Sequence, residues 1–517
     1  MAYTNPPALP RELWGCIESH LSNADIKSLR LACKQFNNAV FLRLNRVFLS
    51  ANPLNIASHD KLRHQINEII WDEARLYRGP ARVIGNGLGS GHELLSDEDE
   101  PDNNREWAAE YHPDIREDVI KRHKYKRRDG CPRWFKDACE ENLGVLEYRK
   151  RRDVDRPDHI ARRELVLAQP SLREAWQHYL QLLRQQKDVL ADRSDLEAFA
   201  FGVKRFPTLK RITITPAAHG NLITPLYPTP MIRAFPKGFN YPIPRGWLYP
   251  RDHWAPATAY TWNQYPELRD RYRGFRTAIR VLANEPNSVS ELVMTSSSIP
   301  TGINCTIFDE PCEEYDHFVT VLKKPGFRRL DIALLVNGER QEDLEACWRS
   351  LLNGHLAYSD RYPLLPLQSI VPMEQWSKLR HFELSDFVIS QDDCVSFLKT
   401  LPNSVRSIGL SLLEFLGDGD WYSMLEEIKR MVSESTLWGD RDAGSRPKIT
   451  IGVPIVQESP TYGHGVWVEK EVEDFIYDEG GNPFEEPRHL NNVRLGVGVM
   501  RDALEPDFEH PYVEWAL

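Results

Sequence analysis

The chain has 517 residues, a mass of 59.9 kDa and a formal net charge of −10 at pH 7. Hydrophobic residues make up 41% and charged residues 27%, which excludes a disordered or collagen-like chain and leaves ample material for a folded core. The net negative charge argues against a general electrostatic clamp on nucleic acid. Because the chain has no long apolar run and its start lacks a secretory signal pattern, we expect a soluble intracellular protein.

The residues that enzymes need for catalysis do not occur here in any familiar pattern. The eight cysteines are too sparse for a disulfide scaffold and none forms a C-x-x-C pair, so we expect buried free thiols. The chain holds no H-E-x-x-H, no phosphate-binding G-x-x-x-x-G-K-[ST] and no G-x-S-x-G. Asp392 and Asp393 stand beside Cys394, but acids favour helix starts, which indicates capping. We therefore predict no catalytic residue, no metal ligand and no cofactor.

The first forty residues predict three short helices. Leu13, Ile17 and Leu21 recur at four-residue intervals, which places them on one helix face. Residues 22–25 form a turn with capping side chains, and a third helix is expected to begin near Cys33. So small a module buries little apolar surface alone, so its apolar face must cover either the rest of the chain or a partner.

The string from Leu9 to Val40, LPRELWGCIESHLSNADIKSLRLACKQFNNAV, resembles an F-box in the form common in filamentous fungi. The resemblance covers about residues 8–48. It implies docking onto the Skp-type adaptor of a cullin–RING ubiquitin ligase, with this chain as a non-catalytic substrate receptor. The positions that match adaptor-facing or core positions of the F-box pattern are Leu9, Pro10, Leu13, Ile17, Leu21, Asp25, Leu29, Cys33, Phe36 and Val40. A helical cap on the following domain remains the alternative.

A second pattern, h-x-x-h-x-h with h apolar, recurs along the rest of the chain and predicts short strands. The instances are Ile66/Ile69/Trp71, Leu209/Ile212/Ile214, Val289/Leu292/Met294, Phe327/Leu330/Ile332, Leu379/Phe382/Leu384, Val405/Ile408/Leu410 and a truncated Ile449/Ile451/Val453. Amphipathic helices are predicted before most of them, at 194–205, 271–284, 314–324, 391–400 and 421–433.

The repetition favours an array in which stacked helix–strand units bury a continuous core. Successive anchors lie between 26 residues (379 to 405) and 143 residues (66 to 209) apart, whereas regular leucine-rich repeats take about 20–29. The expected fold class is therefore α/β, with a small N-terminal helical F-box followed by an irregular leucine-rich-repeat-like helix–strand solenoid. An ordinary α/β domain is the alternative.

Charge and composition divide the rest of the chain. Residues 85–118 hold 11 acids against 2 Lys/Arg, which favours a disordered loop, and 121–152 hold 12 Lys/Arg against 5 acids. We favour a solvated helix face for the basic block over nuclear import or RNA contact. The predicted organisation is an F-box at 8–48, a first repeat-like unit at 49–84, a charged, partly disordered insertion at 85–160, a leucine-rich-repeat-like array at 161–455 and an acidic C-terminal cap at 456–517.

Residues 216–266 hold ten prolines and many aromatic residues, which predicts an ordered irregular loop. Loops on the face of a solenoid often bind, so Trp247, Tyr249, Trp254 and Trp262 are the predicted target-binding residues. The alternative is a loop that only covers the core of its own array. The expected partners are the Skp-type adaptor, the cullin scaffold and a target protein, with neither membrane nor nucleic acid, in the cytoplasm, the nucleus or both.

Overall fold

The computed structural model describes residues 20–21, 23–32, 34, 45–51, 63–77, 130–150, 157–247, 259–297, 299, 301–308, 311–335, 367, 376–385, 387–415, 419–434, 438, 441–454, 464–485, 493–502 and 504–512. Within these residues the chain is mixed α/β and is built on one twelve-stranded sheet, together with a separate two-stranded one. This confirms the predicted α/β class. No helix among the described residues is long and apolar enough to cross a bilayer.

Eight strands pair side by side, in parallel and in chain order. They are β1 (Arg46–Leu49), β2 (Glu68–Asp72), β3 (Arg211–Thr215), β4 (Glu291–Met294), β6 (Arg329–Leu335), β7 (His381–Ser385), β9 (Ser407–Ser411) and β11 (Lys448–Pro454). All seven predicted strand anchors therefore fall in consecutive strands of this parallel ladder, from β2 to β11. The first strand, β1, was missed because it lies at the border of the predicted F-box and carries no complete h-x-x-h-x-h pattern.

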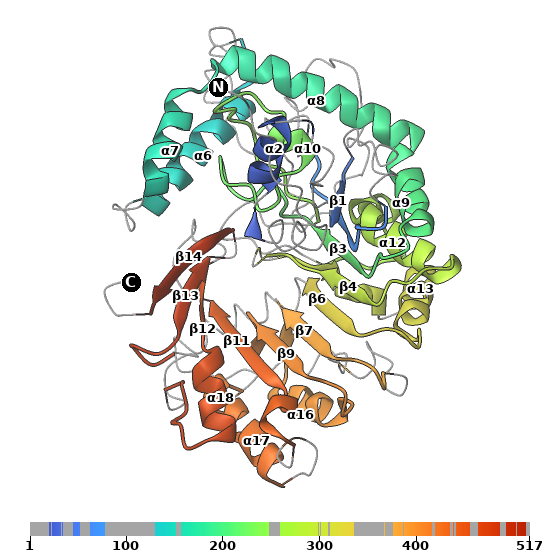
Figure 1. Cartoon of the computed structure of the whole chain (residues 1–517), viewed down its shortest axis with the longest axis vertical. Coiled ribbons are helices and arrows are strands. Elements are labelled where there is room, and N and C mark those ends of the chain that lie inside the picture. The colour runs from blue at the N-terminus through green and yellow to red at the C-terminus, as the bar shows by residue number, and fades with distance from the viewer. Residues whose placement is uncertain are drawn as a thin grey trace, which may run out of the picture.

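One face of the parallel ladder is apolar and packs against helices. Residues in register across neighbouring strands are Ile69, Ile212, Leu292 and Leu330, all fully buried. The predicted helices are confirmed as α9 (Ser194–Arg205), α12 (Arg273–Asn284), α13 (Glu313–Leu322), α16 (Gln391–Thr400) and α17 (Trp421–Glu434). Figure 1 shows the sheet as a curved band with these helices along its outer side. Their apolar side chains and those of the strands form one continuous buried cluster.

Further helices lie before the first of these. They are α6 (Arg133–Lys150), inside the charged insertion predicted at 85–160, α7 (Pro157–Leu167), which crosses its end, and α8 (Leu172–Asp192), which lies in the predicted array, while α2 (Asn23–Ala32) lies in the F-box-like segment. The acidic block 85–118 lies outside the described residues. Trp134 and Phe135 of α6 pack edge-to-face on Trp176 of α8. Within the predicted insertion, the described residues 133–150 are therefore helical and contribute to an aromatic core.

The C-terminal residues extend the same sheet with antiparallel strands. The strands β12 (His464–Trp467), β13 (Val499–Asp502) and β14 (Glu505–Pro511) pair antiparallel after β11, and α18 (Glu469–Tyr477) packs beside β11. Between β13 and β14, Leu504 is buried against Ala217 and Ile299, which follow β3 and β4. This hairpin therefore reaches back to the early strands, as Figure 1 shows.

The remaining short elements lie at the edges of the ladder. They are α10 (Pro230–Arg233), α11 (Pro266–Arg269), β5 (Ile303–Asn304), which pairs with β6, and the pair β8 (Val388–Ile389) and β10 (Glu414–Phe415).

Two helical glycines provide a test of the packing between α12 and β2. A Cβ on Gly274 in α12 would overlap the buried indole of Trp71, whereas a Cβ on Gly144 in α6 meets no atom within 4 Å. We expect Gly274→Ala to lower the free energy of unfolding by about 1–3 kcal/mol, because overpacking outweighs the gain in helix propensity. Gly144→Ala should instead raise it by about 0.5–1 kcal/mol. Urea unfolding of both variants checks the prediction, and equal effects of the two would contradict it.

Candidate functional site

The second face of the parallel ladder carries polar side chains in lateral rows. One row runs Arg46, Glu68, Arg211, Glu291, Arg329, His381, Ser407 and Lys448 from β1 to β11. The charge alternates along its first five positions. Arg46 Nε lies 2.7 Å from Glu68 Oε2, and Arg211 Nη2 lies 2.6 Å from Glu291 Oε2. Basic and acidic side chains on the early strands therefore neutralise each other in pairs.

The segment that follows β3 covers the polar face of the first strands. The ring of Tyr227 lies 6.3 Å from that of Phe48 on β1, and His219 Nε2 lies 3.7 Å from Asp72 Oδ2 at the end of β2. Asp72 and His219 are both fully buried. The proline- and aromatic-rich segment thus closes the face of β1–β3 and leaves the later strands as the accessible part.

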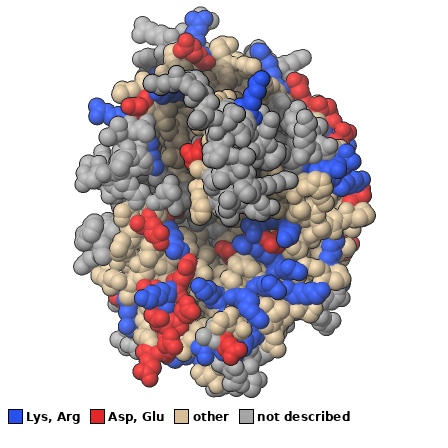
Figure 2. All heavy atoms as spheres, viewed as in Figure 1, with Lys and Arg blue, Asp and Glu red and all other residues tan. Residues whose placement is uncertain are grey.

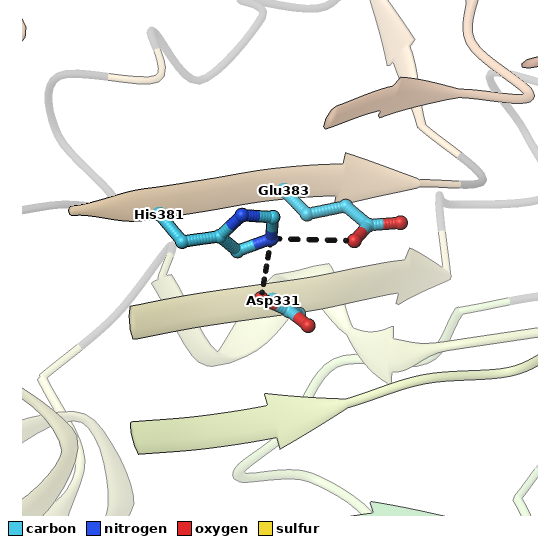
Figure 3. Close-up of side chains that lie close together, drawn as sticks. All are labelled: Asp331, His381 and Glu383. Carbon is cyan, nitrogen blue, oxygen red and sulfur yellow. Dashed lines mark ion pairs between the residues drawn. The ribbon is translucent and has the colours of Figure 1, made fainter. Parts of the chain in front are cut away.

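On that accessible part, β6 and β7 bring three ionisable side chains together. His381 Nε2 lies 3.1 Å from Asp331 Oδ1 and 3.5 Å from Glu383 Oε2, and all three side chains point toward one another (Figure 3). Asp331 also accepts hydrogen bonds from Arg329 Nε, which lies 3.0 Å from each carboxylate oxygen. Burial alone would lower the pKa of His381, but the contacts with Asp331 and Glu383 raise it above its usual value.

The cluster of Asp331, His381 and Glu383 borders an open hollow. The hollow has a volume of about 230 Å³, and its lining includes Asp331 and Glu383 together with Thr295 and Ser385. His381 Nε2 is itself buried. It lies close to both carboxylates, but the geometry is not that of a hydrogen bond to either of them, and no other described group is its partner. The cluster is thus partly accessible from the hollow and holds a ring nitrogen whose hydrogen-bonding capacity is not used.

Exposed basic residues lie beside this cluster, where the later strands begin. Arg328, Arg380 and Arg406 immediately precede β6, β7 and β9, and Lys448 opens β11; all four are exposed. Figure 2 shows Lys and Arg side chains gathered over the lower half of the molecule, where Figure 1 places these strands. Among the described residues, none offers an acidic partner to Arg328, Arg380 or Lys448. We call these four residues the basic edge.

A second ionisable cluster is fully enclosed. Tyr241 Oη lies 2.7 Å from His219 Nδ1, and Asp72 Oδ1 accepts from the backbone N–H of Ala74 at 2.9 Å. Desolvation, opposed by the Ala74 hydrogen bond and aided by the charge of Glu73, raises the pKa of Asp72 to about 8. Desolvation, aided by the charge of Arg245, lowers the pKa of His219 to about 3. Because no part of this cluster is exposed, we assign it to folding and not to binding.

Two of the four predicted target-binding residues are corrected by the structure. Trp247 and Trp262 are each only 1% exposed and belong to the main core, where Trp262 Nε1 donates to Glu314 at 3.1 Å. A buried indole cannot contact a partner, so these two residues are excluded from a target surface. Their segment lies next to the sheet, so burying these large apolar side chains there stabilises the fold. Tyr249 and Trp254 lie outside the described residues.

Most of the predicted adaptor-binding residues lie outside the described part of the chain. They are Leu9, Pro10, Leu13, Ile17, Cys33, Phe36 and Val40. Of the others, Asp25 is exposed on α2, and Leu21 and Leu29 are half-buried. Asp392 and Asp393 lie in the first turn of α16, as expected of acids at a helix start, but the cap itself is Ser390, whose side chain accepts from the backbone N–H of Asp393. The carboxylate of Asp393 accepts from the backbone N–H of Leu367.

Sequence reasoning missed the cluster of Asp331, His381 and Glu383 because it considered contiguous motifs and acids near cysteines, and not side chains on neighbouring strands. The signal was nevertheless present in the repeated pattern. Asp331 and Glu383 both stand between the last two apolar positions of their units, and Arg329 and His381 both precede the middle one. Superimposing the units therefore places Asp331 beside Glu383 on neighbouring strands, as the register has them.

Comparison of the chain with known family models, curated proteins and solved structures finds no match in any of the three.

Proposed function

We propose that this chain is the substrate-recognition subunit of a Skp–cullin–F-box ubiquitin ligase. The observation that carries the proposal is the order and spacing of the motif between Leu9 and Val40. The F-box-like segment binds the Skp-type adaptor, the adaptor joins it to the cullin, and the remainder of the chain holds a target protein. Transfer of ubiquitin is performed by other subunits, so this chain acts by proximity, in the cytoplasm, the nucleus or both.

The exposure of α2 supports a docking role for the segment. Ile26 is fully buried, while Leu31 is 88% exposed and Asp25 is exposed as well. One exposed leucine is ordinary on a protein surface. Here it lies within the F-box-like motif, on another side of α2 from Leu29, which is two residues away. Leu31 is therefore an apolar side chain of the motif that is open to an adaptor.

For the rest of the chain we favour a degenerate, insertion-rich leucine-rich-repeat-like solenoid. Parallel strands in chain order, with helices between them on one face, support this interpretation. The target then binds on the accessible part of the polar face, from β6 to β11. The basic edge lies along it, so an acidic segment of a target protein is the complementary partner.

Adaptor binding by a Leu31→Glu variant tests the proposal. The substitution should leave the free energy of unfolding within about 0.5 kcal/mol of the wild type, because the side chain is exposed. It should weaken binding to a purified Skp-type adaptor at least about 10-fold, since it adds a charge to an apolar contact. Pull-down and isothermal titration calorimetry measure this, and the double variant Leu13→Asp with Ile17→Asp should abolish binding.

A matched control comes from α7. Leu167 is 76% exposed but lies outside the F-box-like segment, so Leu167→Glu should bind the adaptor like the wild type. If the wild type does not bind the adaptor at all, or if binding survives the double variant in a folded protein, the proposal is wrong. If the wild type does not bind the adaptor and a chain that lacks residues 1–45 unfolds, the alternative function is favoured. In that alternative the chain is a non-ubiquitin protein-interaction scaffold, and its N-terminal helices cap the solenoid.

A further inference from the structure

We propose that Asp331, His381 and Glu383 form a binding site for one divalent zinc-type cation on the polar face of the sheet. The three side chains offer one imidazole nitrogen and two carboxylate oxygens, all within 4.8 Å of one another. Zinc sites with an open position are built from three such ligands and a water molecule. The site stands on two adjacent rigid strands, which hold ligands more accurately than loops do.

Two of the three distances between the ligand atoms fit tetrahedral coordination, and the third is at most 4.8 Å. Two ligands at about 2.0–2.1 Å from a tetrahedral ion lie roughly 3.4 Å apart. The distances from His381 Nε2 to Asp331 Oδ1 and Glu383 Oε2, 3.1 and 3.5 Å, lie on either side of that value. Figure 3 shows the same ring nitrogen facing both carboxylates.

The unused hydrogen-bonding capacity of His381 is an independent observation. Its Nε2 is buried and forms no hydrogen bond of acceptable geometry with any described residue, although two acceptors lie close by. Buried ring nitrogens in folded proteins are normally satisfied. A cation between the nitrogen and the two carboxylates would satisfy it and would compensate their negative charges.

Arg329 orients the carboxylate of Asp331. Its Nη2 contacts Oδ2, and its Nε lies 3.0 Å from both oxygens, including Oδ1, which faces His381 and keeps a second acceptor direction for a cation. Carboxylates that bind metals are usually oriented by such a second hydrogen bond. The two carboxylates and this one guanidinium leave a net charge of −1 around the ligand atoms, which still attracts a divalent cation.

The fourth coordination position faces the hollow. Asp331 and Glu383 line the hollow of about 230 Å³ together with Thr295 and Ser385, and this space admits water or another oxygen donor. A single imidazole among so few ligands favours Zn²⁺ over Mg²⁺, which prefers six oxygen ligands in octahedral geometry. The inference goes beyond the proposed function and does not depend on it.

Equilibrium dialysis of the metal-stripped full chain against Zn²⁺ tests the site, with bound metal measured by elemental analysis. We expect the wild type to bind one more Zn²⁺ per chain than Glu383→Gln or His381→Gln, or to bind it at least about 10-fold more tightly. Co²⁺ in place of Zn²⁺ should give the intense visible absorption of a four-coordinate ion without a thiolate band. Mg²⁺ in excess should not displace it.

The control variant is Glu291→Gln, which removes a carboxylate of the same face on the neighbouring strand β4. Glu291 pairs with Arg211 and not with the cluster, so this variant should bind Zn²⁺ like the wild type. Urea unfolding of each variant establishes that it is folded. Equal stoichiometry and affinity for the wild type, Glu383→Gln and His381→Gln would overturn the proposal, as would a six-coordinate Co²⁺ spectrum.

Discussion

Replacing Asp72 with asparagine should make the protein more stable at pH 8 and should remove part of the dependence of its stability on pH. Asp72 is buried at the end of β2, and its Oδ2 has no hydrogen-bond partner among the described residues. Desolvation raises its pKa from 3.8 to about 8. The folded protein therefore keeps Asp72 protonated at neutral pH, and ionisation inside the core is unfavourable.

The sign follows from proton linkage. The pKa of Asp72 is raised by folding, so the folded state binds more protons than the unfolded state between pH 3.8 and about 8. Stability must then fall as the pH rises through this range and level off above it. Glu73 acts in the same direction between 4.5 and about 7, because its burial also raises its pKa. His219 acts in the opposite direction, since stability falls as the pH drops from 6.5 to about 3.

Asp72 makes the larger contribution between pH 7 and 8, because Glu73 is already about half ionised at pH 7. Over this unit the wild type should lose about 1 kcal/mol of unfolding free energy through Asp72 and about 0.3 kcal/mol through Glu73, whereas Asp72→Asn should lose only the smaller amount. Asparagine keeps the acceptor for the Ala74 N–H and carries no charge. Urea unfolding at pH 5, 6, 7 and 8 gives the profile.

The variant Glu73→Gln is the matched control for Asp72→Asn. It should roughly halve the slope of the profile between pH 5 and 7, where Asp72 still contributes, and leave most of the loss between pH 7 and 8 in place, because the pKa of Glu73 is the lower of the two. Groups that surround Asp72, namely His219, Tyr241 and Arg245, are unchanged in both variants. A wild-type profile that is flat between pH 7 and 8 would show that Asp72 is already ionised in the fold.

Most strands of the sheet could be predicted from the sequence because each of them carries the same pattern of apolar residues, h-x-x-h-x-h. Alternation places Ile212 and Ile214 on one face of β3, and the same spacing recurs in the other units. Stacking such units in chain order needs no information beyond the pattern. The missed strand β1 shows the limit of the rule, because four residues carry too few apolar positions to be distinguished from a helix end.

Contacts between distant segments could not be read from any local pattern. The burial of Leu504 against Ala217 joins the last hairpin to a loop nearly three hundred residues earlier in the chain, and neither segment carries a signal for the other. The aromatic residues of 216–266 presented the same difficulty. Composition showed that Trp247 would be ordered, but only the fold shows that it is buried. The cluster of Asp331, His381 and Glu383 is an intermediate case. Both of its strands were predicted, but only their register shows that the three side chains meet.

Replacing Glu314 with alanine should destabilise the protein by about 3 kcal/mol, because it removes the carboxylate shared by the half-buried guanidinium groups of Arg269 and Arg276. Glu314 on α13 is 4% exposed and accepts from Arg269 Nη2 at 2.5 Å, from Arg276 Nε at 2.8 Å and from Trp262 Nε1 at 3.1 Å. Burial alone would raise its pKa, but these three donors lower it to about 2. The carboxylate is therefore ionised at neutral pH, and its contribution is lost only as the pH falls from 4.5 through about 2.

The neighbouring Glu313 isolates the effect of this network. Its side chain is 72% exposed and lies 3.9 Å from His317, so Glu313→Ala should change the free energy of unfolding by less than about 0.5 kcal/mol. Glu314→Gln should fall between the two, because the amide keeps one acceptor and places an N–H₂ group near the guanidinium groups. Denaturant midpoints of the three variants at pH 7 test this order. Equal midpoints for Glu313→Ala and Glu314→Ala would mean that the donors find other partners, and that Glu314 does not hold the aromatic segment against α13.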